Sequence, residues 1–269
     1  MRLVSNLKNL LVSSERKPRR ILAGPFKDIV MGLSLRSQTQ IYPGLFEKQI
    51  HPWLNRLSQG IATAIDIGAA HGEYTLYFLQ KTRATKVLAF EPDASLLSCL
   101  NENLALNGID QLERLEISTK FVGISNTEHE IRLDSLAPSL HGPCFIKMDV
   151  DGAEEKVLNG ANTINALTNV RWLIETHSSQ LELLCERILT AAGFQIRIIP
   201  NARWRVLFPN NAQSNITAGW QHGKAKEAFS RGWVCQLIGS VPSGRSSKAT
   251  IASNRREGLR DSQNDDTLQ

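Results

Sequence analysis

Short apolar runs alternate with amphipathic stretches between residues 60 and 238, and this alternation limits the possible folds most strongly. The runs have the length and composition of buried strands: Ala62–Ile67, Lys86–Phe90, Glu116–Val122, Cys144–Asp149, Val170–Glu175, Phe194–Ile199 and Gly232–Ile238. The amphipathic stretches have the spacing of helices: Glu73–Lys81, Ala94–Asn107, Ala153–Asn159 and Leu181–Ala192. Buried strands that alternate with helices predict a parallel sheet covered by helices on both faces. No helix is evident between the last two strands, which favours an antiparallel pair at one edge.

Composition excludes several classes of protein. The chain has 269 residues, of which 42% are hydrophobic and 21% charged, so collagen-like, disulfide-scaffold and wholly disordered chains are excluded. The net charge of +5 arises at the N-terminus, where the first forty residues carry eight lysines and arginines but two acids. We therefore expect a basic, solvated lead-in over residues 1–43, one domain over 44–239 and a disordered polar tail over 240–269.

Cysteine spacing and hydropathy bear on the compartment. The four cysteines, Cys99, Cys144, Cys185 and Cys235, form no Cys-x-x-Cys pair, so a zinc ribbon or thioredoxin-type site is not indicated. The sequence shows no signal-peptide apolar region and no run of about 18 apolar residues that would span a membrane. We predict a cytoplasmic protein without a transmembrane segment.

A glycine-containing loop follows the first predicted strand, with the pattern Asp66-x-Gly68-x-x-x-Gly72. In open α/β sheets, ligands bind beyond the carboxyl ends of the strands where the strand order reverses, and glycine allows the backbone to approach a ligand closely. Glu91 ends the next strand, where an acid can accept hydrogen bonds from ribose hydroxyls. The loop therefore predicts a site for an adenosine cofactor, with a plain turn that binds nothing as the alternative.

The same loop discriminates between cofactors. The dinucleotide fingerprint requires glycine where this chain has Ala70 and Glu73, and Glu73 would face a pyrophosphate, which argues against NAD or FAD. Asp66 before the turn instead suits a cationic ligand without phosphate. S-adenosylmethionine, with its sulfonium, amino group and ribose, is such a ligand.

Acids and a histidine end the fourth and fifth predicted strands. Asp149 ends one strand and Asp151 follows it, and Glu175 ends the next strand and His177 follows it. Residues two apart on a strand share a face, so these side chains could converge. Methyl transfer to a hydroxyl requires that the hydroxyl be positioned and lose its proton, and Asp149, His177 or Glu154 could act as the base. A divalent metal bound here could instead lower the hydroxyl pKa, but we assign no residue as a metal ligand. Asp151 and Glu154 also match a capping box for the following helix.

Together these motifs resemble the FkbM family of S-adenosylmethionine-dependent methyltransferases. The similar segments lie between about residues 44 and 195: Gly44–Glu47, Ile65–Thr75, Ala89–Pro92, Leu133–Leu136, Ile146–Glu154, Val157–Ala161 and Glu175–His177. The run Ile-Lys-x-Asp-Val-x-Gly-Ala-Glu is the most specific of them. The chain departs from the family at Ala70, where asparagine is common, and at Asp151, where glutamate is common.

The resemblance implies a Rossmann-like class I methyltransferase fold. This is a seven-stranded, mostly parallel sheet of order 3-2-1-4-5-7-6, with the last strand inserted antiparallel beside the edge strand and helices on both faces. With the loop, it predicts these cofactor-binding residues: Asp66, Gly68, Ala69, Ala70, Gly72, Tyr74, Glu91 and Asp149. The predicted catalytic residues are Asp149, His177 and Glu154.

The predicted function is S-adenosylmethionine-dependent O-methylation of a hydroxyl on a small molecule or glycan. The alternative is a non-catalytic module on the same fold that binds the cofactor or a partner. A nucleic-acid acceptor is disfavoured, because the fourth strand ends in Asp149-Val-Asp-Gly instead of the Asn/Asp-Pro-Pro-Tyr of amino-methylating enzymes. Trp204, Trp220 and Trp233, with neighbouring arginines, are interpreted as faces of a late strand. The oligomeric state is left open.

Overall fold

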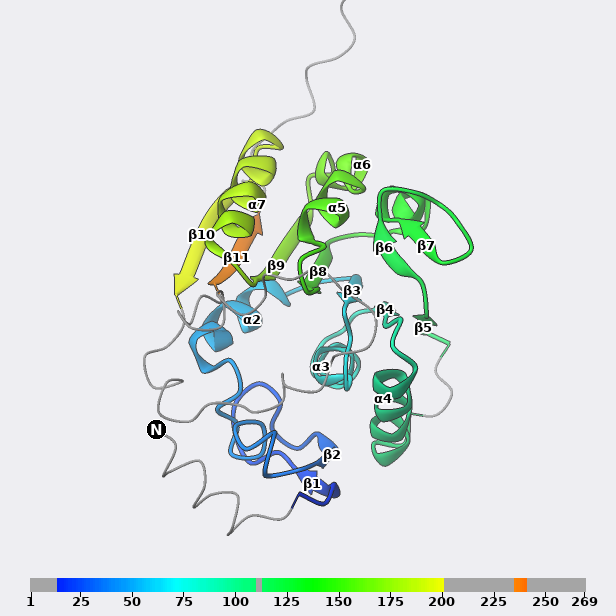
Figure 1. Ribbon diagram of the computed structural model, residues 1–269, viewed down its shortest axis with the longest axis vertical. Helices are drawn as coiled ribbons and strands as arrows, with labels where there is room; N and C mark the ends of the chain where they lie inside the picture. The colour runs from blue at the N-terminus through cyan, green and yellow to red at the C-terminus, as the bar shows by residue number, and fades with distance from the viewer. Residues whose placement is uncertain (1–13, 110–112, 201–234, 241–269) are drawn as a thin grey trace, which may run out of the picture.

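A computed structural model describes residues 14–109, 113–200 and 235–240. The predicted polar tail and the three late tryptophans lie outside these residues. A seven-stranded sheet forms the centre, in the order β10-β11-β9-β8-β3-β4-β5 (Figure 1). Its strands are β3 (Thr63–Ile67), β4 (Lys86–Phe90), β5 (Leu115–Ser118), β8 (Cys144–Asp149), β9 (Val170–Thr176), β10 (Gln195–Pro200) and β11 (Cys235–Ser240).

The predicted mostly parallel α/β sheet is confirmed, and its strand order is the one that the resemblance implies. β11 runs antiparallel to both β9 and β10, between which it is inserted, so β10 forms the edge. All other neighbours in this sheet pair in parallel. Hydrophobic periodicity identifies strands but carries no information about which strands pair, so the inserted position of β11 follows from the resemblance and not from the apolar pattern.

The third predicted strand, Glu116–Val122, is divided in the structure. Its first part is β5, and its end belongs to β6 (Phe121–Gly123). β6 pairs in parallel with β7 (Glu130–Arg132) in a separate two-stranded sheet. Ser118 and Lys120 stand at the break, where the Ser118 hydroxyl accepts a hydrogen bond from the Lys120 amide.

Helices cover both faces of the central sheet. They are α2 (His51–Leu57), α3 (Glu73–Lys81), α4 (Ala94–Leu106), α5 (Glu154–Asn159), α6 (Asn162–Asn165) and α7 (Ser179–Ala191), with 3-10 turns η1 (Lys48–Ile50) and η2 (Leu133–Ser139). In Figure 1, α5 and α7 lie on one side of the sheet and α2 and α3 on the other. Within the described residues, no helix is long and apolar enough to cross a bilayer. The predicted cytoplasmic location stays a prediction.

Alternate residues of each strand pack into different apolar layers, as the two-residue period of a strand requires. On β3, Ala64 packs with α3 and α4, whereas Ile65 and Ile67 pack with α5 and α7. On β8, Phe145 lies in the first layer and Ile146 in the second. The same alternation directs Asp66, Lys147 and Asp149 toward the α3 side, which sets the position of the polar site.

The segment before residue 44 contributes to the core. β1 (Lys17–Arg20) and β2 (Val30–Leu33) form a hairpin, and its neighbourhood buries side chains in the layer that contains α3: Ile21, Phe26, Ile29, Met31, Leu33 and Ile41. The packed unit therefore begins before the boundary expected at residue 44. Although β1 is basic and mostly exposed, apolar residues follow it closely enough to hold the hairpin on the domain.

Asn103 on α4 joins this hairpin to the glycine loop. Its side chain is completely buried, its Oδ1 accepts from the Gly32 amide at 2.8 Å, and its Nδ2 donates to the His71 carbonyl at 2.7 Å. The side-chain amide of Asn103 thus pairs a backbone N–H of β2 and a backbone carbonyl of the glycine loop.

Asn103→Leu should destabilise the fold, because it leaves the Gly32 N–H and the His71 carbonyl without their partner. The expected loss is roughly 2–4 kcal/mol of unfolding free energy, measured by urea denaturation. Asn101→Leu, on the exposed face of the same helix, is the matched control. Equal losses in the two variants would contradict the bridging role.

Candidate functional site

Charged side chains form a row on one face of the sheet near its carboxyl edge. Asp66 on β3 is the register partner of Lys147 on β8, and Asp149 on β8 is the partner of Glu175 on β9. The Lys147 Nζ lies 3.5 Å from Asp149 Oδ2 and 4.0 Å from Glu175 Oε2. It also lies 4.8 Å from the centre of the Tyr74 ring. Strand pairing therefore assembles a buried ammonium among carboxyl groups.

Lys147 remains charged despite its burial. Burial alone would lower its pKa, but the carboxyl groups of Asp149, Glu47 and Glu175 raise it above the ordinary value. Burial opposes ionisation of Asp149 too, yet Lys147 and His177 lower the pKa of this carboxyl. The two groups therefore stabilise each other's charged form.

Glu175 behaves differently from its register partner. Burial, followed by the charges of Asp149 and Glu47, raises its pKa well above the usual range. Two carboxyl groups so close together do not both ionise easily. The same neighbourhood therefore shifts the pKa of Glu175 upward and that of Asp149, beside Lys147, downward.

Glu47 enters the site from the segment before α2. It is buried and precedes η1 with a φ of 48°. The Tyr74 hydroxyl donates a hydrogen bond to Glu47 Oε2, so this predicted cofactor residue is directed toward Glu47 in the structure. The site predictions included neither Glu47 nor Lys147. A lysine in the apolar run Cys144–Asp149 was the available signal, because a buried lysine requires partners.

His177 lies beyond β9 and is surrounded by three carboxyl groups. Its Nδ1 is 3.2 Å from Glu154 Oε1, and its Nε2 is 3.5 Å from Asp149 Oδ1 and 3.3 Å from Asp151 Oδ1. Burial would lower the pKa of His177, but these neighbours raise it above the usual value. The structure thus brings the three predicted catalytic residues together.

Two details of this cluster differ from the sequence interpretation. Glu154 is completely buried behind the imidazole, so it cannot touch a substrate as a base and instead orients His177. The capping box is wrong, because α5 is preceded by Ala153 and receives no side-chain cap. The Asp151 carboxylate instead lies 3.3 Å from His177 Nε2 and does not bond the backbone amides at the start of α5.

The glycines of the loop are required by packing within the protein. Gly68 has a φ of 78°, and a Cβ added there would lie 1.9 Å from the Asp149 carbonyl oxygen. Gly72 has a φ of 88°, and its added Cβ would lie 2.8 Å from Leu100 Cδ1. These contacts differ from the ligand approach expected from the sequence. Gly68 allows the loop to lie against the end of β8, beside Asp149, and Gly72 allows it to lie against Leu100 of α4.

Glu91 connects the loop to the end of β4. Its Oε2 accepts from the Ala70 amide at 2.8 Å, and its Oε1 accepts from the Asp93 amide at 2.9 Å. Burial raises the pKa of Glu91, and these two backbone hydrogen bonds oppose that rise. Each carboxylate oxygen has capacity for a further hydrogen bond.

Asp66 lies beneath the loop. It is 1% exposed, and its Oδ2 accepts from the Thr75 hydroxyl at 2.6 Å, which ties β3 to α3. Burial raises the pKa of Asp66 to about 7. In this conformation Asp66 supports the start of α3 from below.

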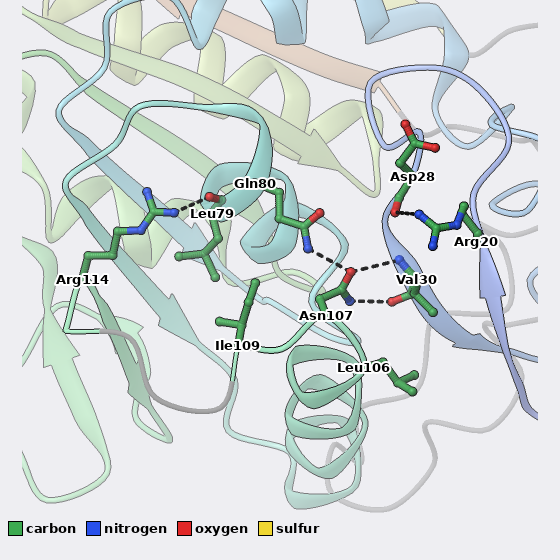
Figure 2. Close-up of a pocket in the computed structure, with 9 residues that line it drawn as sticks. All are labelled: Arg20, Asp28, Val30, Leu79, Gln80, Leu106, Asn107, Ile109 and Arg114. Carbon is green, nitrogen blue, oxygen red and sulfur yellow. Dashed lines mark hydrogen bonds between the residues drawn. The ribbon is translucent and has the colours of Figure 1, made fainter.

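A shallow hollow of about 520 Å³ lies elsewhere, between the hairpin and the C-terminal ends of α3 and α4 (Figure 2). Figure 2 shows that its polar groups form hydrogen bonds with one another. The Gln80 side-chain amide and the Val30 backbone N–H both donate to Asn107 Oδ1, and Arg114 donates to the Leu79 carbonyl. None of the charged row lines this hollow. The chemistry of the molecule is therefore concentrated at the carboxyl edge of the sheet.

Comparison with solved structures finds methyltransferases. The chain is similar to a methyltransferase FkbM from Methylobacillus flagellatus KT, with 18% identity and a TM-score of 0.49 over 66% of this chain and 43% of that one. It is also similar to an rRNA methylase from Streptococcus thermophilus, with 13% identity and a TM-score of 0.46 over 72% and 97% of the two chains. The match thus spans less than half of the FkbM chain. No protein-family model and no curated protein sequence matches.

Asp66 should make the stability of the fold depend on pH. Its pKa is about 4 in an unfolded chain and about 7 in the folded one, so between these values the folded state holds the extra proton. The unfolding free energy due to Asp66 therefore falls as pH rises through this range.

Asp66→Asn keeps an oxygen for Thr75 and removes the titration. Relative to the wild type, this variant should gain up to about 4 kcal/mol between pH 4 and pH 8, measured by urea denaturation at each pH. Glu128→Gln, at an exposed acid, is the control. Parallel pH curves for the Asp66 variant and the wild type would refute this assignment.

Proposed function

We propose that this chain is an S-adenosylmethionine-dependent methyltransferase that methylates a hydroxyl on a small molecule or glycan. The observation that carries the proposal is the junction at the carboxyl ends of β3 and β8. The chain order runs from β3 through β4 to β5 on one side and from β8 to β9 on the other, so the strand order reverses there. Ligands of open α/β sheets bind at such a point. The inserted antiparallel β11 further supports a class I methyltransferase fold.

The donor set at this junction fits the cofactor. Glu91 can accept hydrogen bonds from ribose hydroxyls while it holds the Ala70 amide. Glu73 begins α3, so the start of this helix carries an acid where a phosphate would otherwise be favoured. The surrounding carboxylates suit a cation. When bound, S-adenosylmethionine supplies a methyl group on a positively charged sulfur.

The side chains beside this junction are arranged to hold an acceptor hydroxyl. Asp149 is kept ionised by buried Lys147, and His177 is oriented by Glu154. With Glu154 at Nδ1, the other nitrogen of His177 faces Asp149 and Asp151, where a hydroxyl could be bound and lose its proton. Asp149 and His177 are thus the proposed acceptor-side residues, and Glu154 acts through His177.

Glu91→Gln should weaken cofactor binding without unfolding the chain. Loss of a charged acceptor costs about 1.5–3 kcal/mol, so the Kd for S-adenosylmethionine should rise roughly 10- to 100-fold in titration calorimetry. Glu116→Gln, at an exposed acid paired with Lys86, is the control. No saturable binding by the wild type, or an unchanged Kd in a folded Glu91 variant, would overturn the proposal.

His177→Gln should separate methyl transfer from cofactor binding. The variant should bind the cofactor as the wild type does, while transfer of labelled methyl to hydroxylated acceptors falls about 10²–10⁴-fold. His129→Ala, at an exposed histidine near β7, is the matched control. Cofactor binding by the wild type without transfer across sugars, phenols and aliphatic alcohols would instead support the non-catalytic module.

A further inference from the structure

Three potential metal ligands converge beside the proposed acceptor position. One ligand atom from each of Asp149, Glu175 and His177 lies within 4.8 Å of the others. Asp149 and Glu175 are register partners on adjacent parallel strands, and His177 follows β9 directly. Strand pairing, and not a loop, therefore sets the spacing of the two carboxyl groups.

The orientation of the imidazole points to a ligand at its free nitrogen. Glu154 is completely buried, its Oε1 faces His177 Nδ1, and its Oε2 has no hydrogen-bond partner among the described residues. A buried carboxylate that holds one ring nitrogen is the usual support for a histidine that binds a metal through the other. This support is independent of the two carboxyl ligands.

The distances and charges around His177 Nε2 are also those of a metal site. Nε2 is 3.5 Å from Asp149 Oδ1 and 3.3 Å from Asp151 Oδ1. Atoms that share a cation at about 2.0–2.2 Å lie ~3 Å or more apart, so these separations leave room for one. With a neutral imidazole, Lys147 offsets one of the carboxylate charges of Asp149, Asp151 and Glu154, and Glu175 adds a further charge when it loses its proton to bind a cation. The surplus of negative charge suits a divalent cation.

We propose that Asp149, Glu175 and His177 bind a divalent transition-metal cation of the Mn²⁺ type. Mixed imidazole and carboxylate ligands favour such ions over Ca²⁺ or Mg²⁺. Asp151, whose side chain is 74% exposed, stands at the solvent side of His177. This assignment replaces the sequence prediction that no residue binds a metal.

The role of the cation rests on the proposed function, whereas its binding does not. Bound between Nε2 and the acceptor, the cation would hold the hydroxyl oxygen and lower its pKa. The His177 ring would then act as a ligand, and the hydroxyl would lose its proton more easily without a histidine base.

The test is titration of the full-length, chelator-treated protein with Mn²⁺ in the absence of S-adenosylmethionine. Calorimetry should show one Mn²⁺ per chain, and pulsed electron paramagnetic resonance should detect the nitrogen of a coordinated imidazole. His177→Gln should abolish the nitrogen signal, and Asp149→Asn should raise the Kd at least tenfold. Glu154→Gln, which keeps the side-chain volume, should raise it roughly 10- to 100-fold.

His129→Ala should bind Mn²⁺ as the wild type does. Absence of saturable binding by folded wild-type protein would overturn the proposal, as would unchanged affinity and an unchanged nitrogen signal in His177→Gln. Because no cofactor is present, a failure here leaves the binding of S-adenosylmethionine at Glu91 unaffected. Conversely, loss of cofactor binding in Glu91→Gln does not alter the Mn²⁺ result.

Discussion

The buried ammonium of Lys147 is the constraint on which the site depends. A charge removed from water must be compensated nearby, and here the compensation comes from Asp149 and Glu175 on adjoining strands and from Glu47 before α2. The strand register, the docking of the N-terminal segment and the ionisation of Asp149 are therefore linked. A shift of β8 by one residue would move Lys147 into the apolar layer of α5 and α7.

The N-terminal segment belongs to this arrangement both electrostatically and by packing. Glu47 accepts from Tyr74, whose ring lies against Lys147 Nζ. Asn103 connects β2 to the loop that carries Gly68 and Gly72. The residues that hold the loop thus come from parts of the chain far apart in sequence. The hairpin of β1 and β2, which precedes the expected boundary at residue 44, supports the proposed ligand edge through Asn103.

Periodicity and strand-end chemistry predicted much of the molecule. The helix Glu73–Lys81 and the strands Lys86–Phe90 and Cys144–Asp149 coincide with the predicted spans because local apolar pattern determines them. The insertion of β11 depends on pairing between distant segments, which no local pattern encodes. Asp151 was misassigned as a cap because its competing partner, His177, is distant in sequence but adjacent through the β8–β9 pairing.

Depth below the carboxyl edge gives the acids of this site different properties. Asp66 lies beneath the loop with its pKa raised to about 7, whereas Lys147 lowers the pKa of Asp149 and burial raises that of Glu175 well above its usual range. The residue type is nearly the same in each case, so burial and the nearest charge determine the difference. A sequence motif can therefore identify which acids gather at the edge. Their separate roles follow only from strand register and from the position of one lysine.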